Sequence, residues 1–177
     1  MSIKSFNKGY IQIYTGNGKG KTTAALGLAF RAAGHGFRTY IAQFMKGQVY
    51  GELISVRFIP EITIEQFGKD TFIHVDHALP EDIEMAEHGL EKAKQSMCSG
   101  SYQIIILDEI NVALHFKLLT LDQVMNFLSI KPPAIELILT GRYAPKNLVE
   151  KADLVTEMME VKHYYQQNVM ARDGIER

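Results

Sequence analysis

A glycine-rich stretch near the start of the chain has the residue types that bind a phosphate chain. Glycines let the backbone turn its N–H groups inward toward an anion, a lysine can reach a terminal phosphate, and a threonine hydroxyl can ligate Mg²⁺. A helix that follows such a turn adds the positive end of its dipole. The candidate nucleotide-binding residues are Asn17, Gly18, Lys19, Gly20, Lys21, Thr22 and Thr23.

This stretch departs from the usual P-loop at its first position. Counting back from Gly20, the residue at the first glycine of G-x-x-x-x-G-K-[ST] is Thr15. The loop is therefore poor in glycine at its start and dense in glycine at its centre. We expect it to bind phosphate with N–H groups presented differently from those of an ordinary ATPase. The alternative is a glycine-rich turn without a ligand.

Two acids, Asp108 and Glu109, follow the apolar run 104–107. The carboxyl end of a buried strand is where open α/β sheets bind ligands, and P-loop proteins hold Mg²⁺ there with an acid. The sequence predicts a Mg²⁺ (or Mn²⁺) site formed by Thr22, Asp108 and Glu109. The alternative is that the two acids only cap the following turn.

Two basic residues follow other apolar runs. Arg142 comes after Leu139-Thr140-Gly141, and its planar guanidinium suits a phosphate chain. A surface salt bridge is the alternative for Arg142. Lys46 comes after Gln43-Phe44-Met45, and the pattern leaves open whether it faces the ligand or the solvent.

Apolar runs and amphipathic segments alternate along the chain and must position these residues. We expect strands at 10–14, 39–45, 62–67, 102–107, 135–140 and 154–159, and helices at 24–33, 50–58, 80–97, 121–128 and 146–151. Such alternation predicts an α/β fold, namely a P-loop NTPase-like domain with a mostly parallel central sheet and helices on both faces. We expect residues 1–177 to form this single domain, with an N-terminal tail at 1–8 and an irregular C-terminal segment at 161–177.

Composition narrows the class of protein. The net charge of −1 gives no electrostatic case for nucleic acid or an anionic membrane. Cys98 is the only cysteine, so a disulfide framework is excluded. No apolar stretch reaches the roughly 18 residues of a membrane span. We expect a cytoplasmic protein, in which the pair His74 and His77 is a surface feature rather than a metal site.

In order along the chain, these residues resemble the P-loop ATP:corrinoid adenosyltransferases, the family that acts on cob(I)alamin or cob(I)yrinic acid a,c-diamide. The similar segments are spread over nearly the whole chain, at 14–25, 31–36, 43–47, 107–110, 139–142 and 161–163. The family's P-loop has the same atypical form, so the departure at Thr15 supports the resemblance.

The resemblance implies transfer of the 5′-deoxyadenosyl group of ATP to the Co(I) centre of a corrinoid, with triphosphate released, in adenosylcobalamin biosynthesis or salvage. Because Co(I) is already a strong nucleophile, no general base is needed. ATP would lie reversed relative to ordinary P-loop enzymes. Lys21 and Arg142 would be catalytic by stabilising the departing triphosphate. A homodimer and a flavoprotein reductant are the implied partners.

The resemblance is incomplete at the corrinoid. Some family members press a phenylalanine and a tryptophan from the loop after the third strand onto the corrin, and this chain has no tryptophan. Phe72 is the candidate corrinoid contact, with Phe67 as its competitor. Two other functions stay open: an ATP-hydrolysing protein with Glu109 orienting the water, and an ATP-binding regulatory module without chemistry.

Overall fold

The computed structural model describes residues 4–70 and 78–177. Its strands are β1 (Ile11–Thr15), β2 (Thr39–Phe44), β3 (Ile62–Phe67), β4 (Ile104–Asp108), β5 (Glu136–Thr140) and β6 (Leu154–Glu157). Its α-helices are α1 (Lys21–Ala33), α2 (Gly51–Ser55), α3 (Pro80–Cys98), α4 (Ile110–His115), α5 (Leu121–Ser129) and α6 (Lys146–Lys151). Two 3₁₀-helices complete the elements, η1 (Val56–Phe58) and η2 (Tyr164–Gln167).

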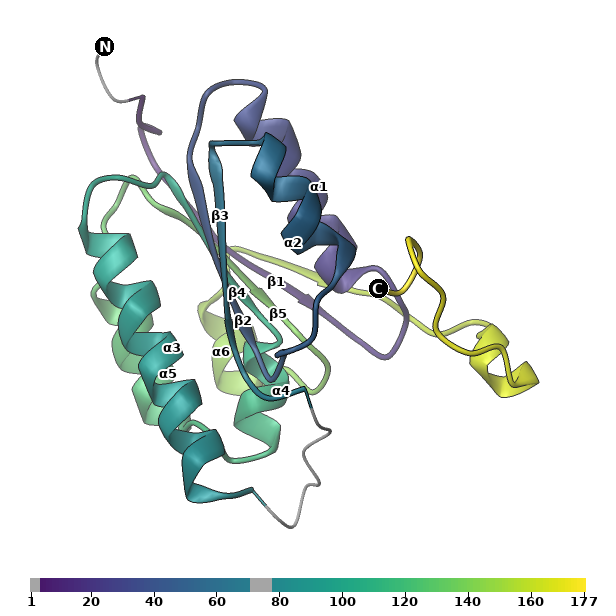
Figure 1. The fold of residues 1–177 in the computed structure, drawn as a ribbon. Helices are drawn as coiled ribbons and strands as arrows, with labels where there is room; N and C mark the ends of the chain where they lie inside the picture. Colours follow the sequence, from purple (N-terminus) through teal and green to yellow (C-terminus); the bar gives the residue numbers. More distant parts are fainter. Residues whose placement is uncertain (1–3, 71–77) are drawn as a thin grey trace.

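The strands form one sheet in the order β3-β2-β4-β5-β1-β6, and every pairing is parallel (Figure 1). Strand β5 lies between β1, which leads into the glycine-rich loop, and β4, which ends at Asp108. Because all strands run the same way, the loop, the acids and Arg142 leave the sheet at one edge. The predicted α/β fold is confirmed.

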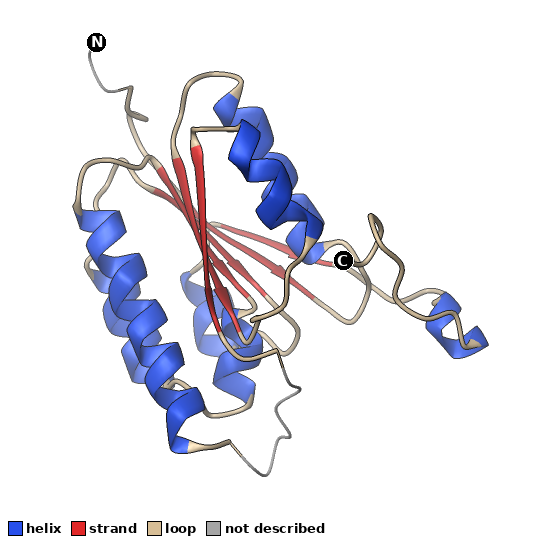
Figure 2. Ribbon diagram, viewed as in Figure 1, coloured by secondary structure: helices blue, strands red, loops and turns tan. Residues whose placement is uncertain are grey.

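The central strands β2, β4 and β5 are buried on both faces because helices cover both. In β4, Ile105 and Leu107 belong to one core cluster, while Ile104 and Ile106 belong to the other. Helices α3, α4, α5 and α6 cover the first face, and α1 with the α2–η1 segment covers the second (Figure 2). Alternation of side chains between two buried faces explains the continuous apolar runs of the sequence.

Helix α4 was missing from the expected elements. It has only six residues and begins directly after β4, separated from it by Glu109 in a left-handed conformation (φ 63°). Periodicity cannot resolve so short an apolar helix from the strand before it. The expected helix at 50–58 is divided into α2 and η1.

The longest helix among the described residues is α3, with 19 residues. Acidic and basic side chains occupy its outer face, and its buried side packs on the sheet. Over 4–70 and 78–177, none of the helices has the length and apolar character needed to cross a membrane.

Candidate active site

The glycine-rich loop turns sharply between β1 and α1. Gly16 and Gly20 have positive φ angles of 91° and 110°, which favour glycine. A Cβ on Gly18 would lie 2.7 Å from the carbonyl oxygen of Met159, so the segment after β6 allows no side chain there. Thr15 replaces the first glycine of the usual pattern because it is the last residue of β1 and pairs with Glu157 of β6.

Lys21, the first residue of α1, folds back over this loop. Its ammonium donates to the carbonyl oxygens of Gly16 (2.8 Å) and Gly18 (2.7 Å), and the residue is only 7% exposed. Burial lowers the pKa of Lys21, as does Arg142, against the opposing charges of Glu109 and Asp108. A cation held this close to its own loop carbonyls can extend toward an anion by exchanging those weak acceptors for a charged one.

Asp108, the last residue of β4, connects this strand to α1 and β5 through its carboxylate. Its Oδ1 accepts hydrogen bonds from the hydroxyls of Thr22 (2.9 Å) and Thr140 (2.7 Å). The same Thr140 hydroxyl accepts from the backbone N–H of Glu109 at 2.9 Å. The predicted neighbours Thr22 and Asp108 are thus in direct contact, and Thr140 at the end of β5 fixes both acids.

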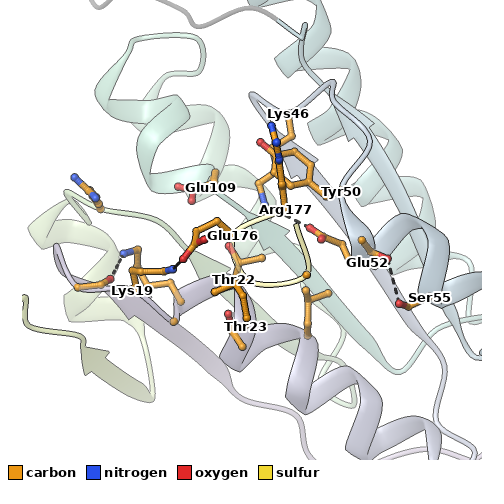
Figure 3. Close-up of a pocket in the computed structure, with 18 residues that line it drawn as sticks. Lys19, Thr22, Thr23, Lys46, Tyr50, Glu52, Ser55, Glu109, Glu176 and Arg177 are labelled. Carbon is orange, nitrogen blue, oxygen red and sulfur yellow. Dashed lines mark hydrogen bonds and ion pairs between the residues drawn. The ribbon is translucent and has the colours of Figure 1, made fainter. Parts of the chain in front are cut away.

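Glu109 faces the cavity beside the loop (Figure 3). Burial and the adjacent Asp108 raise its pKa, although Lys46, Lys21 and Arg142 oppose this rise. Burial and the neighbouring carboxylate therefore act against ionisation of Glu109, and the three nearby cations act for it. The side chain caps no N–H group of α4, so the alternative that it serves only as a cap is wrong.

Lys46 faces the site rather than the solvent. Its side chain is 14% exposed, and its ammonium lies 2.8 Å from Oδ2 of Asp108. Burial lowers the pKa of Lys46, but the charge and hydrogen bond of Asp108, with Glu52 and Glu109, outweigh burial and raise it overall. Lys46 is therefore a charged part of the acid cluster.

Arg142 extends from the turn after β5. Gly141 in that turn has a φ of 126°, and its carbonyl oxygen accepts a hydrogen bond from buried Asn111 at 3.1 Å. The arginine is exposed and lines the cavity beside the P-loop. It forms no ion pair with another residue of the described ranges. The alternative that Arg142 serves in a surface salt bridge therefore has no support.

Two cavities meet at this edge of the sheet. The first, of about 570 Å³, is polar and lined by Gly18, Lys19, Gly20, Lys21, Thr22, Thr23, Leu26, Lys46, Tyr50, Gly51, Glu52, Ser55, Glu109, Arg142, Gly174, Ile175, Glu176 and Arg177 (Figure 3). The second, of about 380 Å³, adds the apolar side chains Phe44, Met45, Val112, Phe116 and Tyr143. Lys46, Tyr50, Glu109 and Arg142 line both cavities, so a polar and an apolar space share one wall. Asn17 is exposed and outside both linings.

The C-terminal segment reaches back to the P-loop. Glu176 forms an ion pair with Lys19, and the hydroxyl of Tyr164 contacts both side chains. The ammonium of Lys19 also lies 5.0 Å from the centre of the Tyr164 ring. Residues 174–177 therefore line the P-loop cavity (Figure 3), although this part of the sequence is polar and irregular.

The two phenylalanines that could contact the corrin, Phe72 and Phe67, differ in what the structure says of them. Phe72 lies outside the described residues, as do His74 and His77. Phe67 is 8% exposed and packs in the core, with its ring 6.3 Å from Phe44 and against Gly89 of α3. Phe67 is therefore a core residue, and the competing assignment to the corrin face is wrong.

Several residues of the site were not predicted from the sequence. Gln43 and Thr140 had a signal, because both are polar residues at the carboxyl ends of buried strands. Glu52 lies on a short surface helix, and Glu176 is 157 residues from its partner Lys19. Neither has a local pattern that could reveal it.

Comparison with known proteins gives consistent matches. The family model described as "ATP:corrinoid adenosyltransferase BtuR/CobO/CobP" matches residues 7–177. A corrinoid adenosyltransferase from Sinorhizobium sp. is 38% identical, covering 99% of this chain and 84% of the relative. One from Pseudomonas aeruginosa is 34% identical, covering 96% and 84%. A KaiC-like protein from Pyrococcus horikoshii OT3 shares the fold at a TM-score of 0.55 and 16% identity, covering 87% of this chain and 74% of that structure.

Proposed function

The chain belongs to the ATP:corrinoid adenosyltransferase family, which transfers an adenosyl group from ATP to a corrinoid, and from this premise we propose how its site performs the reaction. The observation that carries the proposal is the convergence of Lys21, Thr22 and Arg142 on one cavity at the N-terminus of α1. Buried Asp108 lies behind this cavity and is hydrogen-bonded to Thr22. These groups suit a triphosphate leaving group. None is arranged as a nucleophile with its base, and Co(I) needs no such pair.

The polar cavity would bind the triphosphate. The positive end of the α1 dipole and the loop N–H groups favour an anion there. Lys21 would leave the carbonyl oxygens of Gly16 and Gly18 for a phosphate oxygen, with Lys19 and Thr23 as further contacts. Arg142, which lines the same cavity, would be a further contact. As the cobalt–carbon bond forms and the C5′–O bond breaks, the electron pair departs with the triphosphate, and these cations stabilise its added charge.

A divalent cation fits the donors that the structure brings together. The Thr22 hydroxyl and Asp108 carboxylate are hard oxygen donors 2.9 Å apart, and Glu109 faces the same cavity. Burial and Asp108 raise the pKa of Glu109, and a bound cation would oppose that rise. We propose that Thr22, Asp108 and Glu109 hold Mg²⁺ or Mn²⁺, which when bound would neutralise charge on the triphosphate.

The apolar cavity is proposed as the side from which the corrinoid approaches. Its half-buried Met45, Val112 and Phe116 side chains suit the apolar face of a corrin ring, and it adjoins the triphosphate site through Arg142 and Glu109. An attack on C5′ requires the two substrates to meet at such a shared wall. The proposed contact of Phe72 with the corrin rests on the family resemblance.

The proposal also includes a cytoplasmic location, a homodimer and a flavoprotein reductant. A cytoplasmic location is supported by the single cysteine and by the need for a reduced cobalt. A homodimer and a flavoprotein reductant are supported by family resemblance.

The experiment is a product analysis under anaerobic conditions. The protein is incubated with ATP, Mg²⁺ and chemically reduced cobalamin. We expect the light-sensitive spectrum of a cobalt–carbon bond together with triphosphate. Inorganic phosphate without that spectrum would indicate a hydrolase instead, and no turnover would indicate a binding module.

A further inference from the structure

The buried carboxylate of Asp108 has a donor at every position that a metal could use. The hydroxyls of Thr22 and Thr140 donate to Oδ1 at 2.9 and 2.7 Å. The ammonium of Lys46 donates to Oδ2 at 2.8 Å, and the side-chain amide of Gln43 does so at 3.2 Å. Asp108 is only 1% exposed. A divalent cation can therefore reach this carboxylate only if one of its present partners moves.

Two of the donors are held in place by other contacts. Thr140 is fully buried. Its hydroxyl donates a hydrogen bond to Asp108 and accepts one from the backbone N–H of Glu109. Gln43 is also fully buried. Its side chain accepts a hydrogen bond from Gln66 at 3.1 Å and donates one to Glu52 at 3.0 Å. Thr22 is itself an expected ligand of the metal. None of these three is suited to leave.

Lys46 differs because it is long, reaches the cavity and has another partner close by. Its ammonium lies 3.9 Å from Oε1 of Glu52 and 5.2 Å from the centre of the Tyr50 ring. A small rotation of the lysine stem would move the charge from Asp108 to these groups. A buried carboxylate is unfavourable without a compensating cation, so Lys46 can leave only as another cation arrives.

We infer that Lys46 is a positioning residue that occupies Oδ2 of Asp108 until ATP and its metal arrive together, and then moves to Glu52. This inference rests on the proposed function, because it concerns the same metal site. Its consequence is a strict order of binding. The metal alone cannot displace Lys46, whereas the ATP–metal complex brings phosphate oxygens that complete the coordination of the metal, so that the metal replaces the charge that Lys46 withdraws from Asp108.

The experiment measures binding of Mn²⁺ to the full chain without nucleotide, by loss of the electron paramagnetic resonance signal of free Mn²⁺. The variants are Lys46→Met, which keeps the stem and removes the charge, and Lys46→Arg, which keeps a charge. Lys94→Met on the outer surface of α3, where Lys94 pairs with Glu91 at 3.6 Å, removes the same charge far from the site. Far-UV circular dichroism checks folding, and Lys46→Gln replaces Lys46→Met if the latter does not fold.

We expect Lys46→Met to bind Mn²⁺ about tenfold or more tightly than the wild type, the scale of one charge-assisted hydrogen bond. Lys46→Arg and Lys94→Met should bind as weakly as the wild type. Adding Asp108→Asn to Lys46→Met should abolish the gain. With ATP present, the wild type should bind the ATP–Mn²⁺ complex tightly, measured as Mn²⁺ that is retained with the protein in equilibrium dialysis against the same ATP and Mn²⁺.

Equal Mn²⁺ affinity of the wild type and Lys46→Met without nucleotide would overturn the inference. So would a gain that persists when Asp108 is replaced. These outcomes are independent of the proposed function, which fails only if the wild type forms no cobalt–carbon bond from ATP and reduced corrinoid.

Discussion

The ammonium of Lys21 donates to the carbonyl oxygen of Gly18 across 2.7 Å, so the lysine that opens α1 is folded onto its own loop. Gly16 supplies a second carbonyl acceptor at 2.8 Å. Phosphate oxygens carry more charge than carbonyl oxygens, and a triphosphate in the loop would draw the ammonium away from both. In this structure the loop therefore holds the Lys21 ammonium at the place from which it could contact a bound phosphate.

Replacement of Lys21 by alanine should reduce kcat/KM for ATP about a hundredfold, or by about 3 kcal/mol in transition-state stabilisation. The loss combines weaker ATP binding with a less stabilised leaving group. Steady-state kinetics with reduced cobalamin measure it, and Lys94→Ala on the outer face of α3 is the matched control. Near wild-type kcat/KM in Lys21→Ala would refute the phosphate role of Lys21.

Replacement of Glu109 by glutamine should lower turnover and shift the metal requirement upward, because a neutral amide is a poorer ligand for a hard cation. The check is a Mg²⁺ titration of the initial rate. Lost activity with an unchanged titration would contradict the ligand role and point to a base.

The same variant should be more stable than the wild type at neutral pH without metal or nucleotide. A carboxyl pKa raised by burial and by Asp108 means that folding disfavours the ionised form, so the wild type loses stability as the pH rises from the ordinary carboxyl value through the raised pKa. Glu109→Gln lacks this loss. Its higher Tm at pH 7 should converge on the wild-type value as the pH falls through that window, and a lower Tm at pH 7 would contradict the expectation.

Replacement of Thr140 by valine removes the hydroxyl that donates to Asp108 and accepts from the backbone of Glu109. We expect a loss of about 1–3 kcal/mol in the free energy of unfolding, because the buried N–H of Glu109 is left without its partner. Turnover should fall as well. Thr156→Val, the same change at an exposed position of β6, is the control for both chemical denaturation and kinetics. Equal stability of the two variants would contradict the positioning role of Thr140.

Replacement of Glu176 by glutamine should tighten ATP binding, because Lys19 would no longer be held by a carboxylate that competes with phosphate. Isothermal titration calorimetry with a non-reactive ATP analogue measures the change, and Glu150→Gln on the exposed side of α6 is the control. Weaker binding in Glu176→Gln would mean that Glu176 positions Lys19 for ATP rather than competing for it.

The sequence predicted the parts of the site that depend on local patterns. Lys21 and Asp108 follow strands whose apolar runs are unmistakable, and the fold brings Asp108 to Thr22 at 2.9 Å. Helix α4 was missed because its six residues are too few to show a helical repeat. The contacts of Lys46 with Glu52 and of Lys19 with Glu176 arise from tertiary packing between segments without a shared pattern, so no periodicity could reveal them.

The central claim is that this site breaks the bond between C5′ and oxygen in ATP, and an isotope label reads that bond directly. ATP carrying ¹⁸O in the bridge between C5′ and the α-phosphorus is incubated with the protein, Mg²⁺ and reduced cobalamin, and the products are analysed by mass spectrometry. We expect the label in free triphosphate, with one adenosylated corrinoid formed for each triphosphate. Label retained in ADP, together with unlabelled inorganic phosphate, would show cleavage at phosphorus and contradict the claim.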